Sequence, residues 1–447
     1  MKNQSIKKTN SISRRDFLML TGLSTGALLT GCATDAVTGK RYFSLMSEAA
    51  ERDLDLENAP HQFSADYGAV QYPSVNAYVT DIGKGLATKS HRPNAPYSFR
   101  AVNAVYVNAY TFPAGSIAIT RGMLMAMDSE AQLAAVLGHE IGHVNARHVG
   151  KQMSKGILIQ TLVATTALVA AYTKEEYAGI TAGLGTLAAG ALLAKYSRAN
   201  EYEADALGLR YAALAGHNAQ GCIDLMDTLI NLSKNKPNII ELLFASHPMS
   251  TDRYKRAVAQ SNKDYAYSLT LPMGRERYMD NLAPLRKDSI VIDNLQKGEQ
   301  SLAGNNLNDA KSFFQSALQV KPDDYAGLLL MSKYNITVKQ HSEALRYATE
   351  ARAAYPAEPQ AIYVEAACLL RLKRFDEAFT GFDEYDRKLP GNPNVLFFKG
   401  YCKENAGNRA QAADLYIKYL QKVSQGDNAE YAHKRLLEWG YIKPTQT

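Results

Sequence analysis

The residues best suited to chemistry lie in the segment 129–150, which reads SEAQLAAVLGHEIGHVNARHVG. His139 and His143 are four residues apart with Glu140 beside the first, which is the HExxH pattern. On a helix, both imidazoles lie on one face about a turn apart and can hold one Zn²⁺ ion. Glu140 then sits next to the metal, where a carboxylate can take a proton from a zinc-bound water. HExxH alone is only moderately specific, so a third ligand has to be found elsewhere in the chain.

The periodicity of this segment supports the helix that the two histidines need. Its apolar residues recur at helical spacing, which indicates an amphipathic helix. These residues are Leu133, Val136, Leu137, Ile141 and Val144. Ser129 followed by Gln132 matches a capping box at the start of the helix.

A second helix is expected at 197–205, SRANEYEAD, which contains no Gly or Pro and continues into apolar residues at helical spacing. Glu201 and Asp205 share one face of it, whereas Glu203 points elsewhere. A catalytic zinc takes three protein ligands and keeps one position open, and two His with one Glu is a standard set. Glu201 therefore supplies the missing ligand, and Asp205 can fix the tautomer of a ligating imidazole by accepting its hydrogen bond.

The joint occurrence of HEIGH and SRxxEYxAD resembles the HtpX-type gluzincin metallopeptidases, a family that includes the eukaryotic CAAX-processing proteases. The resemblance implies one Zn²⁺ per chain, with Glu140 as general base. The implied zinc ligands are His139, His143 and Glu201.

The metzincin pattern does not fit the same helix. Ala146 and Val149 stand where that pattern needs Gly and His. His148 is therefore not expected to be a ligand, but to pack or hydrogen-bond at the end of the helix.

A further signal is Ser246-His247-Pro248 followed by Arg253, an arrangement that the same family commonly carries. Two catalytic interpretations of His247 follow: it stabilises the oxyanion of the tetrahedral intermediate, or it occupies the open zinc position in a resting form. The alternative is a structural histidine in a turn. Arg253 is expected to help balance charge on the oxyanion.

The first 31 residues predict an export signal. Residues 13–18, SRRDFL, form a twin-arginine motif, and a short apolar run follows at 18–29. The sequence LTGC ending at Cys32 resembles a lipobox, which implies cleavage before Cys32 and its acylation; a signal anchor with an incidental cysteine is the alternative. Ala33 favours sorting to the outer membrane. We therefore expect a periplasmic, lipid-anchored protein that is exported already folded, a departure from family members exported unfolded.

Composition and charge limit the classes of partner. The 447 residues are 46% apolar and 21% charged, which is ordinary for a folded chain of two or three domains. The net charge of +6 falls to +2 without residues 1–31, because 45 basic and 43 acidic residues remain. The mature chain contains no basic block, which excludes a nucleic-acid partner.

Beyond Cys32 the chain has three cysteines, Cys222, Cys368 and Cys402. Their odd number and their spacing do not match a disulfide framework, so buried thiols are expected. Cys368 and Cys402 occupy equivalent positions in successive repeats, where stacked helices lie about 8–10 Å apart, too far for a disulfide.

The region before the HExxH helix predicts a small amount of β-structure. A helix is expected at 73–88, strands at 97–107 and 116–120, and a turn-rich stretch at 108–115. A short strand just before the zinc helix can offer an edge to an extended peptide, so the substrate is expected to lie along residues 115–120.

Two uncharged stretches, 156–173 and 177–194, follow the HExxH helix and are separated by Lys-Glu-Glu. A spanning hairpin would place this triplet on the cytoplasmic side, which the positive-inside rule does not favour. We expect an apolar helical hairpin packed over the peptidase core or resting on the membrane surface; insertion into the bilayer is the alternative.

The C-terminal third repeats with a period of 34 residues. Small residues recur at this spacing in two series, and proline recurs in a third. The series are Ala310, Ala344, Ala378 and Ala412; Gly298, Ser332, Ala366 and Gly400; and Pro322, Pro356 and Pro390. This period is the tetratricopeptide signature, in which stacked helix pairs form a concave peptide-binding surface. Residues 430–441 are expected to form the capping helix.

Together these patterns predict a mainly α fold with a small β-sheet, in which a zinc-peptidase domain precedes an α-solenoid of tetratricopeptide repeats. The expected boundaries are a signal at 1–31, a tether at 32–60 that becomes helical near Ser47, the peptidase domain at 61–285 and the repeats at 290–441.

This combination resembles the periplasmic BepA-like branch of the family. It implies a zinc endopeptidase of the bacterial cell envelope, with polypeptide substrates and with repeats that recruit outer-membrane clients or their assembly machinery. It also implies quality control of misfolded or misassembled outer-membrane and periplasmic proteins. Three alternatives remain: a lipid-anchored chaperone or scaffold with a latent peptidase site, an enzyme that trims specific small peptides, and repeats that serve only as an oligomer interface.

Overall fold

The computed structural model describes residues 31–44, 46–154 and 196–443. The expected export signal, apart from Gly31, and the expected apolar hairpin at 156–194 lie outside the described residues. In the described part of the chain, no helix combines the length and the apolar character needed to cross a bilayer.

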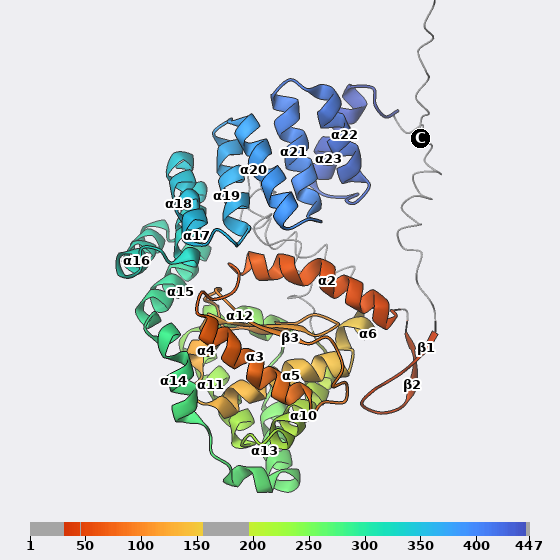
Figure 1. Cartoon of the computed structure of the whole chain (residues 1–447), viewed down its shortest axis with the longest axis vertical. Helices are drawn as coiled ribbons and strands as arrows, with labels where there is room; N and C mark the ends of the chain where they lie inside the picture. Colours follow the sequence, from red (N-terminus) through yellow and green to blue (C-terminus); the bar gives the residue numbers. More distant parts are fainter. Residues whose placement is uncertain (1–30, 45, 155–195, 444–447) are drawn as a thin grey trace, which may run out of the picture.

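The fold is mainly helical with a small sheet, as predicted (Figure 1). The part before residue 287 contains β1 (Gly31–Thr34), β2 (Arg41–Ser44), α2 (Glu48–Ala65), α3 (Pro73–Ala87), β3 (Ser98–Val102), β4 (Ala109–Thr111), β5 (Ser116–Thr120), α4 (Arg121–Ala126), α5 (Glu130–Asn145), α6 (His148–Ser154), α10 (Arg198–Leu214), α11 (Gln220–Asn235), α12 (Pro237–Ser246), α13 (Thr251–Asp264), the 3₁₀ helix Ala266–Thr270 and α14 (Arg275–Arg286). The helical hairpins that follow are α15 (Ser289–Ala303) with α16 (Leu307–Val320), α17 (Tyr325–Thr337) with α18 (His341–Ala354), α19 (Gln360–Arg371) with α20 (Phe375–Lys388), and α21 (Pro393–Asn405) with α22 (Arg409–Leu420), ending in α23 (Asp427–Glu438).

The three-stranded sheet has the order β3-β5-β4, with β5 parallel to β3 and antiparallel to β4. Strand β4 lies in the stretch that was expected to be only a turn. The chain reverses within residues 112–116, where Gly115 has a φ of +118°, so the turn is shorter than expected and leaves room for a strand before it. The expectation that substrate pairs along residues 115–120 is therefore wrong. Strand β5 is hydrogen-bonded on both sides, and the edge strands of this sheet are β3 and β4.

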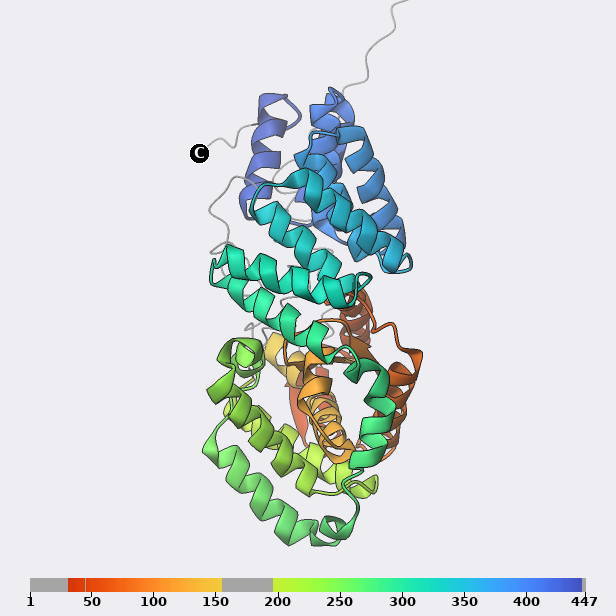
Figure 2. The same ribbon diagram turned by 90° about the vertical axis from the view of Figure 1, so that its left-hand side faces the viewer.

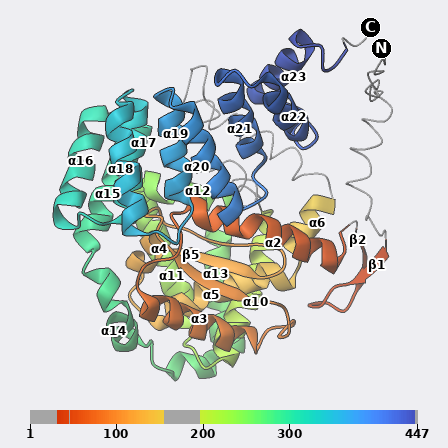
Figure 3. The ribbon, with the colours of Figure 1, turned by 45° about the horizontal axis from the view of Figure 1, so that its top comes forward.

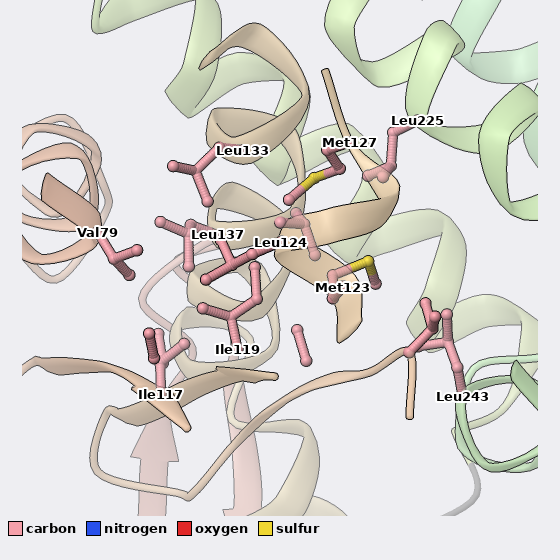
Figure 4. Packing of buried hydrophobic residues seen from close by; sticks show 14 of the residues in the cluster. Val79, Ile117, Ile119, Met123, Leu124, Met127, Leu133, Leu137, Leu225 and Leu243 are labelled. Carbon is pink, nitrogen blue, oxygen red and sulfur yellow. The ribbon is translucent and has the colours of Figure 1, made fainter. Parts of the chain in front are cut away.

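Both faces of the sheet are buried, which explains why β5 is an almost continuous apolar run. On one face, Ile117 and Ile119 pack with Leu133 and Leu137 of α5 and with Val79 of α3 (Figure 4). On the other face, α2 places Ala59 and Phe63 against Tyr110, Phe112 and Ala118. The sheet is thus a layer between α2 and the HExxH helix.

Residues 32–60 were expected to form a tether, but they are folded over much of their length, and α2 within them covers one face of the sheet. Strands β1 and β2 form an antiparallel hairpin, and Ser47 then caps α2 by accepting a hydrogen bond from the backbone N–H of Ala50, at 3.1 Å. The helix begins where the sequence indicated, but it runs across the expected boundary at residue 60 and packs on the sheet.

The 34-residue period corresponds to the stacked helix pairs. The four alanines of the first series have no exposed surface. A Cβ on Gly298 would lie 2.3 Å from the Phe314 ring, and one on Gly400 would lie 2.8 Å from the Tyr416 ring. Small residues are therefore required where the two helices of a pair touch.

A fourth series with the same period was not found from the sequence. The residue two positions after the first helix of each pair adopts a left-handed conformation, with φ between +58° and +81°. These residues are Asn305, Lys339, Lys373 and Gly407. Three of them are not glycine, so residue type gave no signal.

Cys222, Cys368 and Cys402 are buried and free, which confirms the prediction of reduced thiols. Cys368 and Cys402 belong to successive repeats, whose helices are too far apart for a disulfide bond.

The repeats are joined to the first part of the chain by a shared core and by buried polar contacts (Figures 2 and 3). Leu295, Phe314 and Leu330 of the repeats belong to the same apolar cluster as the sheet and α5. Arg121, at the start of α4, donates two hydrogen bonds to the carboxylate of Asp324, the N-cap of α17, at 2.8 and 3.0 Å. Both side chains are only 3% exposed.

The Asp324→Ala variant is expected to destabilise the whole chain by about 3–5 kcal/mol, because Arg121 would stay buried without its partner. Urea unfolding followed by circular dichroism measures the change. The matched control is Asp323→Ala, which removes an exposed neighbouring carboxylate and should shift the midpoint little. Equal midpoints for the two variants would show that the pair does not hold the repeats in place.

Candidate metal centre

The candidate site depends on a close crossing of α5 and α10, which have backbone contact at three glycines. A Cβ on Gly138 would lie 2.8 Å from the carbonyl oxygen of Gly208, and one on Gly142 would lie 2.9 Å from that of Ala204. In return, a Cβ on Gly208 would lie 2.7 Å from the backbone nitrogen of His139. Side chains at these positions would separate the helices, so the glycines set the distance between the two motifs.

Helix α10 begins at a capping box in which Ser197 and Asn200 satisfy each other's backbone N–H groups. This places Glu201 in the first turn, facing the second half of α5. The Nε2 atoms of His139 and His143 are 3.0 Å apart. Glu201 lies 3.4 Å from the Nε2 of His143 and 3.7 Å from that of His139. The structure thus brings together the three residues expected to be ligands.

His247 lies against the same three residues. It is the C-cap of α12, and its Nδ1 is 3.4 Å from the Nε2 of His139 and 3.2 Å from the Oε1 of Glu201. Ligand-capable atoms of all four residues lie within 4.8 Å of one another. His247 is therefore positioned as a fourth donor, and it is not a turn histidine remote from the site.

Asp205 and Arg253 support the cluster from outside. Asp205 Oδ1 is 3.0 Å from the Nδ1 of His139, as expected for a residue that fixes this imidazole. Arg253 donates two hydrogen bonds to Asp205, each of 2.7 Å, and its Nη1 is 2.6 Å from the Oε2 of Glu201. The Arg253 guanidinium therefore contacts two carboxylates and can hold them in place. Arg253 was expected to balance charge on an oxyanion, and its position here does not match that role.

Two further residues support the cluster: His148, which was expected to pack or hydrogen-bond at the end of the helix, and Tyr196, which was missed. The Nδ1 of His148 lies 2.8 Å from the Nδ1 of His143, and its Nε2 lies 3.1 Å from Glu203. Tyr196 stacks on the His143 ring at 3.8 Å, held there by a backbone hydrogen bond from its N–H to the carbonyl of Ser246. In the sequence, Glu203 within SRANEYEAD could have indicated a partner for His148. No sequence feature indicated the contact of Tyr196 with His143.

Glu140 is 1% exposed, and its Oε2 has no hydrogen-bond partner among the described residues. Burial raises the pKa of Glu140, although the neighbouring histidines oppose this. The carboxylate lines a pocket beside His139 and His247 whose other walls are largely apolar, including Met123, Leu225, Phe244 and Met249.

Burial and neighbouring charged groups together determine the protonation of the proposed ligands. Burial holds the pKa of His143 well below its usual value, which keeps the imidazole neutral and able to bind a metal. For Glu201, burial acts to raise the pKa, but the charge of His247 and hydrogen bonds from His143 and His247 outweigh it. The pKa of Glu201 is therefore well below its usual value, and the group is a carboxylate.

The donor chemistry fits a zinc ion. Two imidazoles and a carboxylate form a standard catalytic set, and the nitrogen and oxygen donors suit zinc better than calcium or magnesium. The unpartnered oxygen of Glu140 lies where a general base would need a free acceptor.

Comparison with known proteins finds a family model that matches the part of the chain that carries both motifs. Residues 73–261 match the model of Peptidase family M48. The chain is 24% identical over 307 residues to the beta-barrel assembly-enhancing protease of Escherichia coli (strain K12), covering 63% of this chain and 62% of that protein. The corresponding Yersinia pestis protein is 23% identical over 416 residues, 84% of each chain. Metalloprotease YcaL of Escherichia coli is 28% identical over 248 residues, 53% of this chain and 93% of that protein.

The Gly208→Ala variant is expected to weaken zinc binding and to lower stability by about 1–3 kcal/mol, because the added methyl meets the α5 backbone. Chelator competition measures the affinity, and thermal unfolding measures the stability. The control is Gly85→Ala on α3, where a Cβ meets nothing within 4 Å. This control should leave zinc affinity unchanged and should slightly stabilise the helix. Unchanged affinity for Gly208→Ala would contradict the role given to this crossing.

Proposed function

We propose that the chain is a zinc-dependent endopeptidase of the bacterial cell envelope, because residues 73–261 match the model of Peptidase family M48. The observation that carries the proposal is the meeting of His139, His143 and Glu201 at one point. Beside them lies Glu140, whose Oε2 has no partner in the part of the chain that the structure describes. The chain spans 62% of the length of the Escherichia coli relative, so the activity is inferred from the site itself.

In this proposal His139, His143 and Glu201 hold one Zn²⁺. The ion, when bound, supplies Lewis acidity, which acidifies a water molecule and polarises the peptide carbonyl. Glu140 accepts the proton of the attacking water and passes it to the leaving amine. Its apolar surroundings raise its pKa, which suits a group that must both take up and release a proton. Asp205 and Arg253 hold His139 and Glu201 in position.

His247 is proposed to cap the open metal position in a resting form. Its Nδ1 already lies within 3.4 Å of His139 and within 3.2 Å of Glu201, and its side chain is 7% exposed. A substrate carbonyl needs the same space, so His247 must move before turnover. The position of His247 against His139 and Glu201 also favours a second candidate function. In that function the chain is a lipid-anchored scaffold whose peptidase site stays closed.

The proposed substrates are misfolded or misassembled outer-membrane and periplasmic polypeptides. The relatives named beta-barrel assembly-enhancing protease support this choice, and the repeats offer a surface for recruiting clients or assembly machinery. We place the protein in the periplasm, anchored by acylated Cys32, with the outer membrane as its site. An extended substrate would pair with β4, the edge strand that packs against the HExxH helix.

The Glu140→Gln variant should retain zinc but lose casein cleavage by about 10²–10⁴-fold, because the amide cannot take a proton. Metal content by atomic emission and hydrolysis of fluorescent casein test this in parallel. Glu241→Gln, an exposed glutamate on α12, serves as the control and should behave like wild type. If Glu140→Gln still cleaves casein at the wild-type rate, the hydrolytic assignment is wrong.

The His247→Ala variant should bind zinc more weakly but cleave casein faster, because a fourth donor is lost and the coordination position opens. Zinc affinity and casein turnover, measured on one preparation, test both halves of this expectation. Lower turnover would assign His247 to the oxyanion. Turnover and affinity both unchanged would assign it a structural role only.

A further inference from the structure

The β1–β2 hairpin, which contains Cys32, is fixed to the end of the HExxH helix. It lies beside α6 and the N-terminal end of α2 in two views (Figures 1 and 3). Four pairs of residues align its strands, and the three from Cys32 opposite Phe43 to Thr34 opposite Arg41 remain when the chain is cleaved before Cys32.

The first connection is made by Asp35, directly after β1. Its Oδ1 accepts hydrogen bonds of 2.9 Å from the backbone N–H groups of Val37 and Thr38, which shapes the hairpin turn. Its Oδ2 accepts a hydrogen bond of 2.6 Å from the Nζ of Lys151 on α6. Asp35 is 7% exposed, so this contact is largely shielded from water.

The second connection is made by Arg147, between α5 and α6. Its Nε lies 3.0 and 2.9 Å from the two oxygens of Glu51 on α2, and its Nη2 donates to the carbonyl of Met46, just after the hairpin, at 3.0 Å. Arg147 and Glu51 side chains are 5% and 2% exposed. A Cβ on Gly150 would lie 2.0 Å from Glu51, so α6 and α2 pack without space between them.

These connections end at the candidate metal centre. Lys151 lies one helical turn after His148, and His148 contacts the imidazole of His143. Only Ala33 and Thr34 lie between Cys32 and Asp35, and the three steps between their Cα atoms span about 10 Å at full extension. A lipid on Cys32 would therefore be attached to the catalytic domain with almost no free linker.

We propose that acylated Cys32 and the fixed hairpin hold the metal centre at the membrane surface, so that polypeptide segments emerging from the membrane are cleaved in preference to polypeptides free in the periplasm. The inference rests on the proposed peptidase function and lipid anchor. A domain of this size is roughly 40 Å across, which bounds the distance from the bilayer at which a peptide bond can be cleaved.

The test uses the full lipidated chain in vesicles of phosphatidylethanolamine and phosphatidylglycerol. The vesicles also carry one unfolded reporter segment, held above the bilayer by a helical spacer of about 10 or about 60 residues, roughly 15 or 90 Å long. The wild-type chain should cleave the short-spacer reporter at least about tenfold faster. Equal rates on the two reporters would overturn the proposal.

Two variants test the hairpin itself. A 20-residue Gly/Ser insertion between Thr34 and Asp35 adds about 25 Å of flexible reach, so the rate ratio should fall towards one. Asp35→Asn, which loses the charge that pairs with Lys151, should reduce the ratio partly, whereas Lys40→Gln in the exposed turn should not. Ratios unchanged in both the insertion and Asp35→Asn would overturn the proposal.

Soluble casein separates this proposal from the proposed function. Wild type and the insertion variant should cleave casein in detergent equally fast, because the insertion does not touch the site. Failure of all variants to cleave casein would reject the peptidase function. Casein cleavage without sedimentation of the wild-type chain with vesicles would reject the anchor alone, and with it this inference.

Discussion

The backbone contact between α5 and α10 is the constraint on which the candidate site depends. Neither HEIGH nor SRANEYEAD forms a metal centre alone, and 57 residues lie between His143 and Glu201. Their side chains converge because Gly138, Gly142 and Gly208 let the two helices touch. Gly142 is thus a structural requirement within the HExxH motif itself. The supporting residues Asp205, His148 and Arg253 orient groups that this crossing has already brought together.

The sequence was most informative where chemistry restricts residue type and spacing. Histidines at i and i+4, a glutamate and aspartate at i and i+4, and small residues every 34 positions were all recognised, and each has a local cause. The role of Arg253 was not, because which carboxylate or oxyanion a guanidinium meets depends on the packing of α13. Tyr196 was missed for the same reason, since one backbone hydrogen bond positions it.

The sheet shows a second limit of local patterns. The five residues of β5 were identified by their alternation, but partners and edges depend on contacts that periodicity does not contain. Strand β4 is only three residues long and was assigned to a turn, and this error moved the expected substrate edge from β4 to β5. The packing of α2 on the sheet was also unexpected, because this helix carries many charged residues and buries only a narrow stripe that includes Ala59 and Phe63.

The ion pair between Arg121 and Asp324 gives the repeats a mechanical connection to the peptidase domain. Arg121 follows Thr120, the last residue of β5, and precedes Met123, which forms part of the wall of the pocket beside Glu140. Asp324 starts a helix of the second repeat. Under the proposed function, force exerted on the solenoid by a bound client would therefore reach the central strand and one wall of the cleft through this buried pair. A client held by the repeats would then approach the cleft from a fixed direction.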